Sequence, residues 1–181
     1  MAEIPNELVA QAAAGDMKAF EGLYKATSSF VYNVALRITN NRNDADEVTQ
    51  DVYVKVYDNL RAFGFRSSFK TWIYRITANT AINYCKKHAR HIKGAVEYDP
   101  AVHDVEAPDT AGASLRAEDA QAHVTHLLEA LDADQRACLV LREIEGLDYR
   151  SIAYTLKINI NTVRSRLKRA RERLLAAGRK G

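Results

Sequence analysis

Apolar residues recur at intervals of three and four along most of the chain, which is the spacing of one face of an α-helix. The clearest runs cover residues 17–38, 44–58 and 67–88. Asp16 precedes the first run and two adjacent serines begin the third, and both residue types cap the first amides of helices. Strict alternation of apolar and polar residues, the mark of a half-buried strand, gives no strong signal. The pattern therefore predicts an all-α protein.

The helical pattern is interrupted at residues 94–116, where Pro100, Pro108 and Gly112 stand among five acidic residues. Prolines, glycine and repeated acids favour an extended, flexible segment over a packed one. We therefore expect two small helical domains joined by an acidic linker. The expected domains are an N-terminal helical bundle at residues 1–93 and a C-terminal domain at residues 117–181.

The charge of the chain is unevenly distributed. Residues 59–96 hold eight Lys or Arg and no acid, whereas residues 97–134 hold ten acids and one Arg. Residues 161–181 again hold eight bases, against a single Glu. Two basic blocks separated by an acidic one predict two separate contacts with a polyanion. Taken singly, each block is also compatible with a solvated helix face.

The second basic block belongs to a segment with the pattern of a helix-turn-helix, residues 148–174. Ile152 supplies a buried face to the first helix, and the small Ala153 lets another helix cross closely. Val163 and Leu167 begin an apolar stripe on the second helix, whose opposite face is basic. Such a helix enters the major groove, where Arg hydrogen-bonds to guanine and other basic side chains neutralise phosphates. A basic surface hairpin is the alternative interpretation.

The first basic block interleaves aromatic side chains with Lys and Arg. Single-stranded nucleic acid requires this combination, because bases stack on aromatic faces while cations follow the backbone. Asn79 and Asn83 lie four residues apart on one helical face and offer amides for base edges. Most of the aromatic residues are equally compatible with a core.

A third feature is an acidic stripe on the helix predicted at residues 44–58. Glu47, Asp51 and Asp58 share one helical face with Val54. A solubilising surface is one interpretation of this stripe. A docking surface for a basic partner is the other.

Together these features resemble the extracytoplasmic-function sigma factors, the smallest class of bacterial RNA polymerase sigma subunits. Residues 44–54 look like the core-polymerase-binding helix of that family, and residues 68–79 look like the element that handles the −10 region. Residues 131–173 look like the domain that reads the −35 element. The resemblance covers nearly the whole chain outside the linker.

The resemblance implies a promoter-specificity subunit with no catalytic site, cofactor or metal. Its implied partners are core RNA polymerase, promoter DNA as the −35 duplex and the −10 non-template strand, and an anti-sigma factor. The implied core-polymerase contacts are Asp44, Asp46, Glu47, Gln50, Asp51 and Val54. The implied −10 contacts are Phe63, Phe65, Arg66, Ser67, Lys70, Trp72, Arg75, Asn79 and Asn83. The implied −35 contacts are Thr162, Arg164, Ser165, Arg166, Lys168, Arg169 and Arg171.

The sequence departs from the family pattern at two places. The loop before Ser68 lacks the acid that the family usually has in its pocket for a flipped base. Lys157 and Asn161 stand where the family commonly has glycine. Because non-glycine residues rarely adopt positive φ, a left-handed backbone at Lys157 is predicted to be mildly strained.

The location of the protein is predicted from features that the chain lacks. Its first residues do not have the pattern of a secretory signal, and no apolar run is long enough to span a membrane. The two cysteines are too few for a disulfide framework. We therefore expect a cytoplasmic protein without membrane insertion.

Two other functions are compatible with parts of the sequence. A stand-alone helix-turn-helix regulator would leave the acidic stripe and the first basic block unused. A metal enzyme would use Cys85, His88 and His91, or His123 and His126, since spacings of three place paired ligands on one helical face. No clustered carboxylates complete such a site in the sequence.

Overall fold

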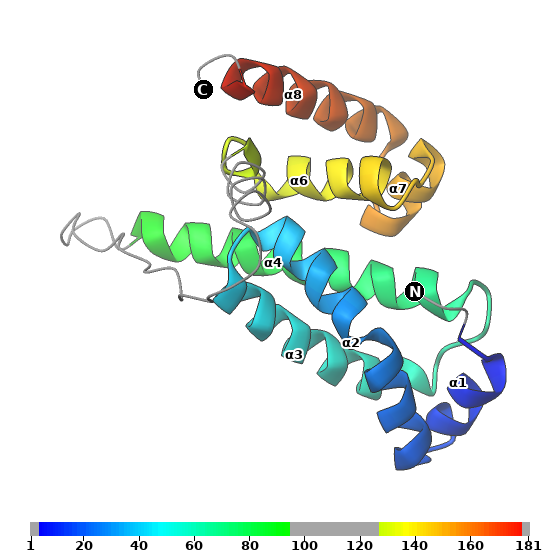
Figure 1. Ribbon diagram of the computed structural model, residues 1–181. Coiled ribbons are helices and arrows are strands. Elements are labelled where there is room, and N and C mark those ends of the chain that lie inside the picture. Colours follow the sequence, from blue (N-terminus) through cyan, green and yellow to red (C-terminus); the bar gives the residue numbers. More distant parts are fainter. Residues whose placement is uncertain (1–3, 95–126, 179–181) are drawn as a thin grey trace, which may run out of the picture.

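The computed structural model describes residues 4–94 and 127–178, and every regular element within these ranges is helical (Figure 1). The expected all-α fold class is thereby confirmed. The elements are α1 (Asn6–Ala13), α2 (Met17–Thr39), α3 (Arg42–Leu60), α4 (Phe69–Gly94), α6 (Ala133–Leu139), η1 (Val140–Ile144), α7 (Tyr149–Leu156) and α8 (Ile160–Gly178). The predicted linker lies outside the described residues from residue 95 onward.

Short polar side chains begin the long helices, as their positions in the sequence predict. The Asp16 carboxylate accepts hydrogen bonds from the backbone amides of Lys18, at 2.8 Å, and of Ala19, at 3.2 Å. Ser68 caps α4 by accepting from the Thr71 amide at 3.1 Å. Helix α3 begins at Arg42, two residues earlier than predicted, after a cap supplied by Asn41.

Helices α2, α3 and α4 pack against one another through the apolar stripes that define their periodicity. Leu23 of α2, Val52 of α3 and Ile73 of α4 are at most 1% exposed. One buried polar pair joins α2 and α3: the Thr27 hydroxyl donates to the Leu23 carbonyl and lies 2.7 Å from the Tyr53 hydroxyl. Because the single hydroxyl hydrogen of Thr27 is donated to the Leu23 carbonyl, the Tyr53 hydroxyl donates to Thr27.

The short helix α1 was not predicted, because only Val9 and Ala12 of its residues are buried and two positions do not make a period. It packs against α2.

In the C-terminal part, the apolar stripe of the helix-turn-helix is buried as predicted. Ile152, Val163 and Leu167 are at most 1% exposed. The turn between α7 and α8 has Lys157 in the left-handed conformation, with φ 53° and ψ 45°, which confirms the strained backbone expected there.

The wide turn η1 was not predicted. Its backbone widens so that the Glu145 amide donates to the Val140 carbonyl five residues earlier, at 3.1 Å. Gly146, at φ 68°, then ends the helix. A π-helical turn of five residues is too short to set an apolar period of its own, so sequence periodicity does not reveal it.

Helix α4 packs on both parts of the molecule. It contacts α2 and α3 on one side and α6 and α7 on the other, and α6 and α7 in turn contact α8. In Figure 1, α6 and α7 accordingly lie between α4 and α8. One buried apolar cluster runs through both parts, from Val31 and Ile73 to Leu141 and Ile152.

We predict that Tyr53→Phe lowers the free energy of unfolding by about 1 kcal/mol, because it removes one buried hydrogen bond while Thr27 keeps its bond to the Leu23 carbonyl. Chemical denaturation measures the change. Tyr24→Phe is the matched control, since Tyr24 packs on Tyr53 but is 46% exposed. An equal loss in the two variants would contradict the assignment.

Candidate nucleic-acid and polymerase interfaces

The acidic stripe predicted on α3 forms a continuous exposed surface, which we call the acidic face. Its exposed members are Asp46, Glu47, Gln50, Asp51 and Val54. The isopropyl group of Val54 is unusual there, because the residue is 61% exposed while its neighbours Val52 and Val56 are buried. A single exposed apolar residue is common on protein surfaces, so the composition of the acidic face is compatible with both interpretations of the stripe.

Part of the acidic face is held in place by α4. The Tyr84 hydroxyl donates to the Glu47 carboxylate at 3.0 Å and lies 3.2 Å from Asp44, which is half-buried. Desolvation and these carboxylates hold the pKa of Tyr84 well above its usual range, so the hydroxyl stays a donor. Asp46 and Asp51 have no such partner within the described part of the chain, so their charges remain available.

Two aromatic residues of the loop between α3 and α4, Phe63 and Phe65, differ in exposure, although the sequence predicts the same −10 contact for both. Phe63 is 7% exposed and packs against Phe69 and Trp72, with ring centroids 5.9 and 5.1 Å away. Phe65 is 45% exposed and has the strained φ of 52°. Phe65 therefore has a free face for a base, while Phe63 supports the loop from below.

Four of the predicted −10 residues line one groove of about 480 Å³ between α3, α4 and the turn after α7. They are Trp72, Arg75, Asn79 and Asn83. Arg66 and Lys70 are exposed outside this groove, and the Lys70 ammonium lies 5.6 Å from the centre of the Phe30 ring. Ser67 is half-buried beside Ser68. The groove is called the amide groove below.

The amide groove also contains residues that sequence reasoning missed. Lys55 and Asn59 enter it from α3, and Lys157 enters it from the turn after α7. Lys55 donates to the Thr80 hydroxyl at 3.0 Å. Lys55 is the one base within the acidic helix 44–58, and that isolation is a signal that could have drawn attention to it. Lys157 could not have been found, because only tertiary packing brings it to α4.

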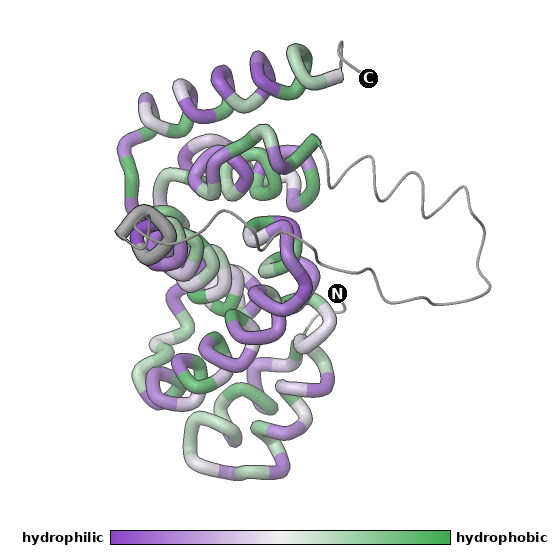
Figure 2. Tube along the Cα trace, turned by 90° about the vertical axis from the view of Figure 1, so that its left-hand side faces the viewer, coloured by the Kyte–Doolittle hydropathy of each residue, from purple (hydrophilic) through white to green (hydrophobic). Residues whose placement is uncertain are grey.

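Helix α8 presents a basic surface, called the recognition face. Hydrophilic and hydrophobic positions alternate along this helix in Figure 2, and its exposed members among the predicted −35 contacts are Arg164, Ser165, Lys168, Arg169 and Arg171. Arg164 lies in the first turns of α8, the part of a recognition helix that reaches base edges. Its guanidinium donates to the Asn161 side chain at 2.9 Å, so Asn161 orients it.

Other predicted −35 residues are less accessible. Arg166 is half-buried and lies 3.3 Å from the Asp134 carboxylate of α6, and Thr162 is also half-buried, with its carbonyl accepting from Ser165. Arg171 pairs with Glu143 at 2.8 Å. Arg169 has no ion pair within the described residues, so its charge is free to contact phosphate.

The metal-enzyme alternative finds no support in the described residues, where no three His, Cys, Asp or Glu side chains come together to hold an ion. The His88 ring stacks on Tyr84, and burial raises the pKa of the Cys85 thiol. His123 and His126 lie outside the described residues, as does the side chain of His91. None of the described helices is long and apolar enough to cross a membrane.

Comparison with known proteins matches both parts of the chain to sigma factors. Residues 23–91 match the family model of Sigma-70 region 2, and residues 123–174 match that of Sigma-70 region 4. The RNA polymerase sigma-H factor of Pseudomonas aeruginosa is 33% identical, over 94% of this chain and 91% of the relative. The ECF RNA polymerase sigma-E factor of Haemophilus influenzae is 34% identical, over 91% and 90%.

Solved structures give the same fold. CnrH in complex with the cytosolic domain of CnrY matches with a TM-score of 0.63 and 26% identity, over 94% of each chain. The sigma factor RpoE of Bartonella quintana, in complex with the anti-sigma factor NepR, matches with a TM-score of 0.66 and 22% identity, over 90% of this chain and 98% of that one.

The fold, the helix-turn-helix and these relatives define a promoter-specificity subunit of bacterial RNA polymerase. The chain belongs to the extracytoplasmic-function (ECF) sigma factors. It binds core RNA polymerase and promoter DNA and directs transcription initiation. The matches to both sigma regions favour this function over that of a stand-alone helix-turn-helix regulator. Members of this family are initiation factors rather than enzymes.

Proposed function

We propose that this sigma factor uses three separate surfaces for three separate contacts. The acidic face contacts core polymerase, the amide groove with Phe65 holds the unpaired −10 non-template strand, and the recognition face reads the −35 duplex. The corresponding domains are residues 1–93 and 117–181, joined by a linker at residues 94–116. Because these partners are in the cytoplasm, the protein acts there.

The observation that carries this proposal is the composition of the amide groove. It combines the Trp72 ring, three amides and the cations Lys55, Arg75 and Lys157 in one cleft. Single-stranded DNA needs an aromatic surface for stacking, amides for base edges and positive charge for phosphates. The hydrogen-bonding edges of bases are accessible in this way only after strands separate, so the groove suits the open −10 region.

We also propose an anti-sigma factor as a partner of a second, more apolar groove of about 840 Å³ between α2, η1 and α8. Leu36, Val140, Ile144 and Leu174 line it, and Arg37 and Glu143 lie at its polar edges. Ile144 is 51% exposed. An exposed apolar cleft with a charged rim favours an amphipathic helix.

The −10 assignment is tested with Asn79→Ala. We expect holoenzyme carrying this variant to bind a −35 duplex as the wild type does but to show much less permanganate reactivity near −10, because a contact to the unpaired strand is lost. Asn33→Ala is the matched control, since the Asn33 amide also bonds the carbonyl four residues earlier but lies on α2. Undiminished opening by Asn79→Ala holoenzyme would overturn the assignment.

The acidic face is tested by reversing one charge. Asp51→Lys should weaken assembly with core polymerase, because it places a cation where a basic partner docks. Thermal stability should stay nearly constant, since the Asp51 side chain is exposed. Glu7→Lys makes the same charge change on exposed residues of α1 and should assemble normally. Equal core affinities for the two variants would place the docking surface elsewhere.

Base reading and phosphate binding by α8 are separable. Arg164→Ala should lower the free energy of binding to the preferred −35 sequence by about 1–3 kcal/mol and change binding to a mismatched sequence little. Arg169→Ala should weaken binding to all sequences alike, and it should reduce by about 1 the slope of the logarithm of the binding constant against the logarithm of salt concentration. Holoenzyme binding to matched and mismatched promoters measures both effects. A uniform loss in Arg164→Ala would remove its role as a base reader.

The anti-sigma groove is tested through Ile144→Asp. A charge in the cleft should abolish co-purification of the anti-sigma factor from the source cells while leaving transcription by holoenzyme intact, because Ile144 lies outside the three surfaces named above. Val54→Asp, which places the same charge on the acidic face, should retain the anti-sigma factor. Retention by Ile144→Asp would contradict this site.

A further inference from the structure

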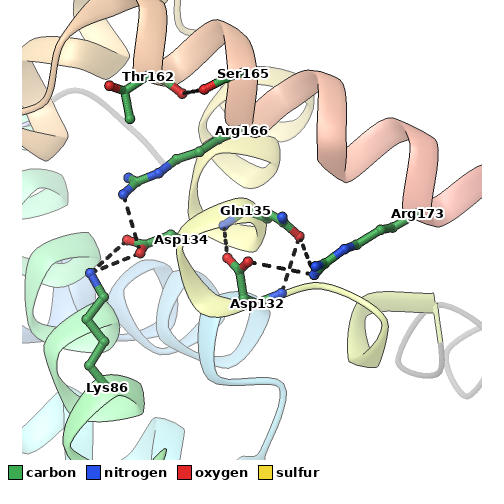
Figure 3. Close-up of polar contacts among 8 residues, drawn as sticks. All are labelled: Lys86, Asp132, Asp134, Gln135, Thr162, Ser165, Arg166 and Arg173. Carbon is green, nitrogen blue, oxygen red and sulfur yellow. Dashed lines mark hydrogen bonds and ion pairs between the residues drawn. The ribbon is translucent and has the colours of Figure 1, made fainter.

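Two arginines of α8 extend toward α6 rather than toward the side that carries Arg164 (Figure 3). Arg166 and Arg173 are seven residues apart, which is close to two helical turns, so they lie on the same side of α8. Arg164 precedes Arg166 by two residues and therefore lies on nearly the opposite side. The second basic block of the sequence thus has members on two sides of one helix.

Both arginines contact the first turn of α6. The Arg166 guanidinium lies 3.3 Å from the Asp134 carboxylate. Arg173 donates to the side-chain carbonyl of Gln135 at 2.9 Å and lies 3.7 Å from the Asp132 carboxylate (Figure 3). The two arginines are separated by about 10 Å along α8, given the rise per residue of an α-helix. Contacts at two such points oppose both rotation of α8 about its own axis and tilting of α8 against α6.

Gln135 is itself held in place by the start of α6. Asp132 caps this helix by accepting from the Gln135 amide at 2.8 Å, and the Gln135 side-chain carbonyl accepts from the Asp132 amide at 3.4 Å. Gln135 is only 4% exposed. A capping box of this kind is a local device of one helix. Here the same carbonyl oxygen also accepts from Arg173, which follows 38 residues later on another helix.

The ion pairs between α6 and α8 differ in their exposure to solvent. The Arg173 and Asp132 side chains are 51% and 55% exposed, and ion pairs at such sites contribute little to stability. The Arg166 and Asp134 side chains are better shielded, at 22% and 23%. Asp134 also accepts from the Lys86 ammonium of α4, at 2.9 Å, so Arg166 has only a share of this carboxylate. The bond from Arg173 to Gln135 is therefore the contact with the best-defined geometry.

Apolar packing and polar contacts have different effects on α8. This helix packs on α6 and α7 and buries Val163, Leu167 and Ala170. Apolar burial has no direction, so it determines which side of α8 is buried without fixing the rotation of the helix closely. A hydrogen bond weakens steeply as it departs from linearity, so the bond to Gln135 does fix the rotation. Rotation matters because a bidentate contact from Arg164 to a base requires one defined geometry.

We propose that Arg166 and Arg173 are positioning residues for −35 recognition: their contacts with the first turn of α6 set the rotation of α8 at which Arg164 meets a base pair. This inference rests on the proposed −35 function of the recognition face. Arg166, which the family resemblance implies as a DNA contact, then acts from inside the domain, and Gln135 acts through Arg173. Loss of a positioning residue changes base discrimination, whereas loss of a phosphate contact weakens binding to every sequence and lowers its salt dependence.

The test measures how well reconstituted holoenzyme distinguishes two −35 duplexes. Wild-type holoenzyme first selects its preferred sequence from duplexes with a randomised −35 element. The mismatched duplex then changes the base pair whose identity matters least to the Arg164→Ala variant relative to the wild type. The ratio of the two affinities is called the discrimination ratio, and repeating the measurement at several salt concentrations gives the salt slope.

Arg173→Met removes the donor but leaves the capping box of α6 intact. We expect the discrimination ratio to fall several-fold while the salt slope stays unchanged. Gln135→Met removes the acceptor and should have the same effect, and the double variant should lose no more than either single one, because both act through one bond. Arg169→Met is the matched control, since it removes an exposed arginine of the same helix. It should keep the wild-type ratio and lower the salt slope by about 1.

Two further variants separate positioning from a loss of folding. Gln135→Glu should keep the wild-type discrimination ratio, because Glu also completes a capping box and its carboxylate also accepts from Arg173. Arg166→Met should lower the ratio at an unchanged salt slope. Since Arg173 is about half exposed, Arg173→Met tests the inference even where Gln135→Met prevents folding.

Lower discrimination ratios in Arg173→Met and Arg166→Met, with unchanged salt slopes and a wild-type ratio in Gln135→Glu, would support the inference. An unchanged ratio in Arg173→Met, or a salt slope lowered by about 1, would overturn it, because the arginine would then be either inert or a phosphate contact. Failure of the proposed function is distinguishable from this result. In that case Arg164→Ala itself would keep the wild-type ratio, whereas failure of the inference alone leaves Arg164→Ala with its discrimination lost.

Discussion

Helix α4 is packed on two sides, and the arrangement of the rest of the molecule depends on this. Toward α2 and α3 it buries Ile73, and its buried Thr77 satisfies its hydroxyl by donating to the Ile73 carbonyl at 2.9 Å. Toward α6 and α7 it presents Arg75 and Asn79, which are polar. On this second side, Arg75 and Asn79 each donate a hydrogen bond to α7.

The electrostatics of the contact are modest compared with its packing. The Lys86 and Asp134 side chains are 46% and 23% exposed, and ion pairs at such partly exposed sites contribute little to stability. The shared apolar cluster and the hydrogen bond from Asn79 to the Thr155 carbonyl of α7 are therefore the main attractions between the two parts, and Asp134 also contacts Arg166 of α8.

The recognition helix shows how a departure from the family pattern is accommodated. Asn161 replaces a frequent glycine, and its side chain accepts a hydrogen bond from Arg164. Lys157 replaces another glycine and retains the left-handed backbone that glycine would adopt more easily. The Lys157 side chain also lines the amide groove. Both substitutions place polar groups beside surfaces assigned to DNA.

The sequence by itself determined the all-α class, the long helices and their caps, and the buried stripe through Val163 and Leu167, because periodicity and capping depend on near neighbours in the chain. The acidic face was predictable for the same reason, because its residues recur at helical spacing. Only the tertiary structure distinguished the supporting Phe63 from the exposed Phe65 and placed Lys157 in the amide groove. The bond from Asn79 to α7 joins residues 76 positions apart. No local pattern encodes such a contact, because it depends on how two separately periodic helices pack.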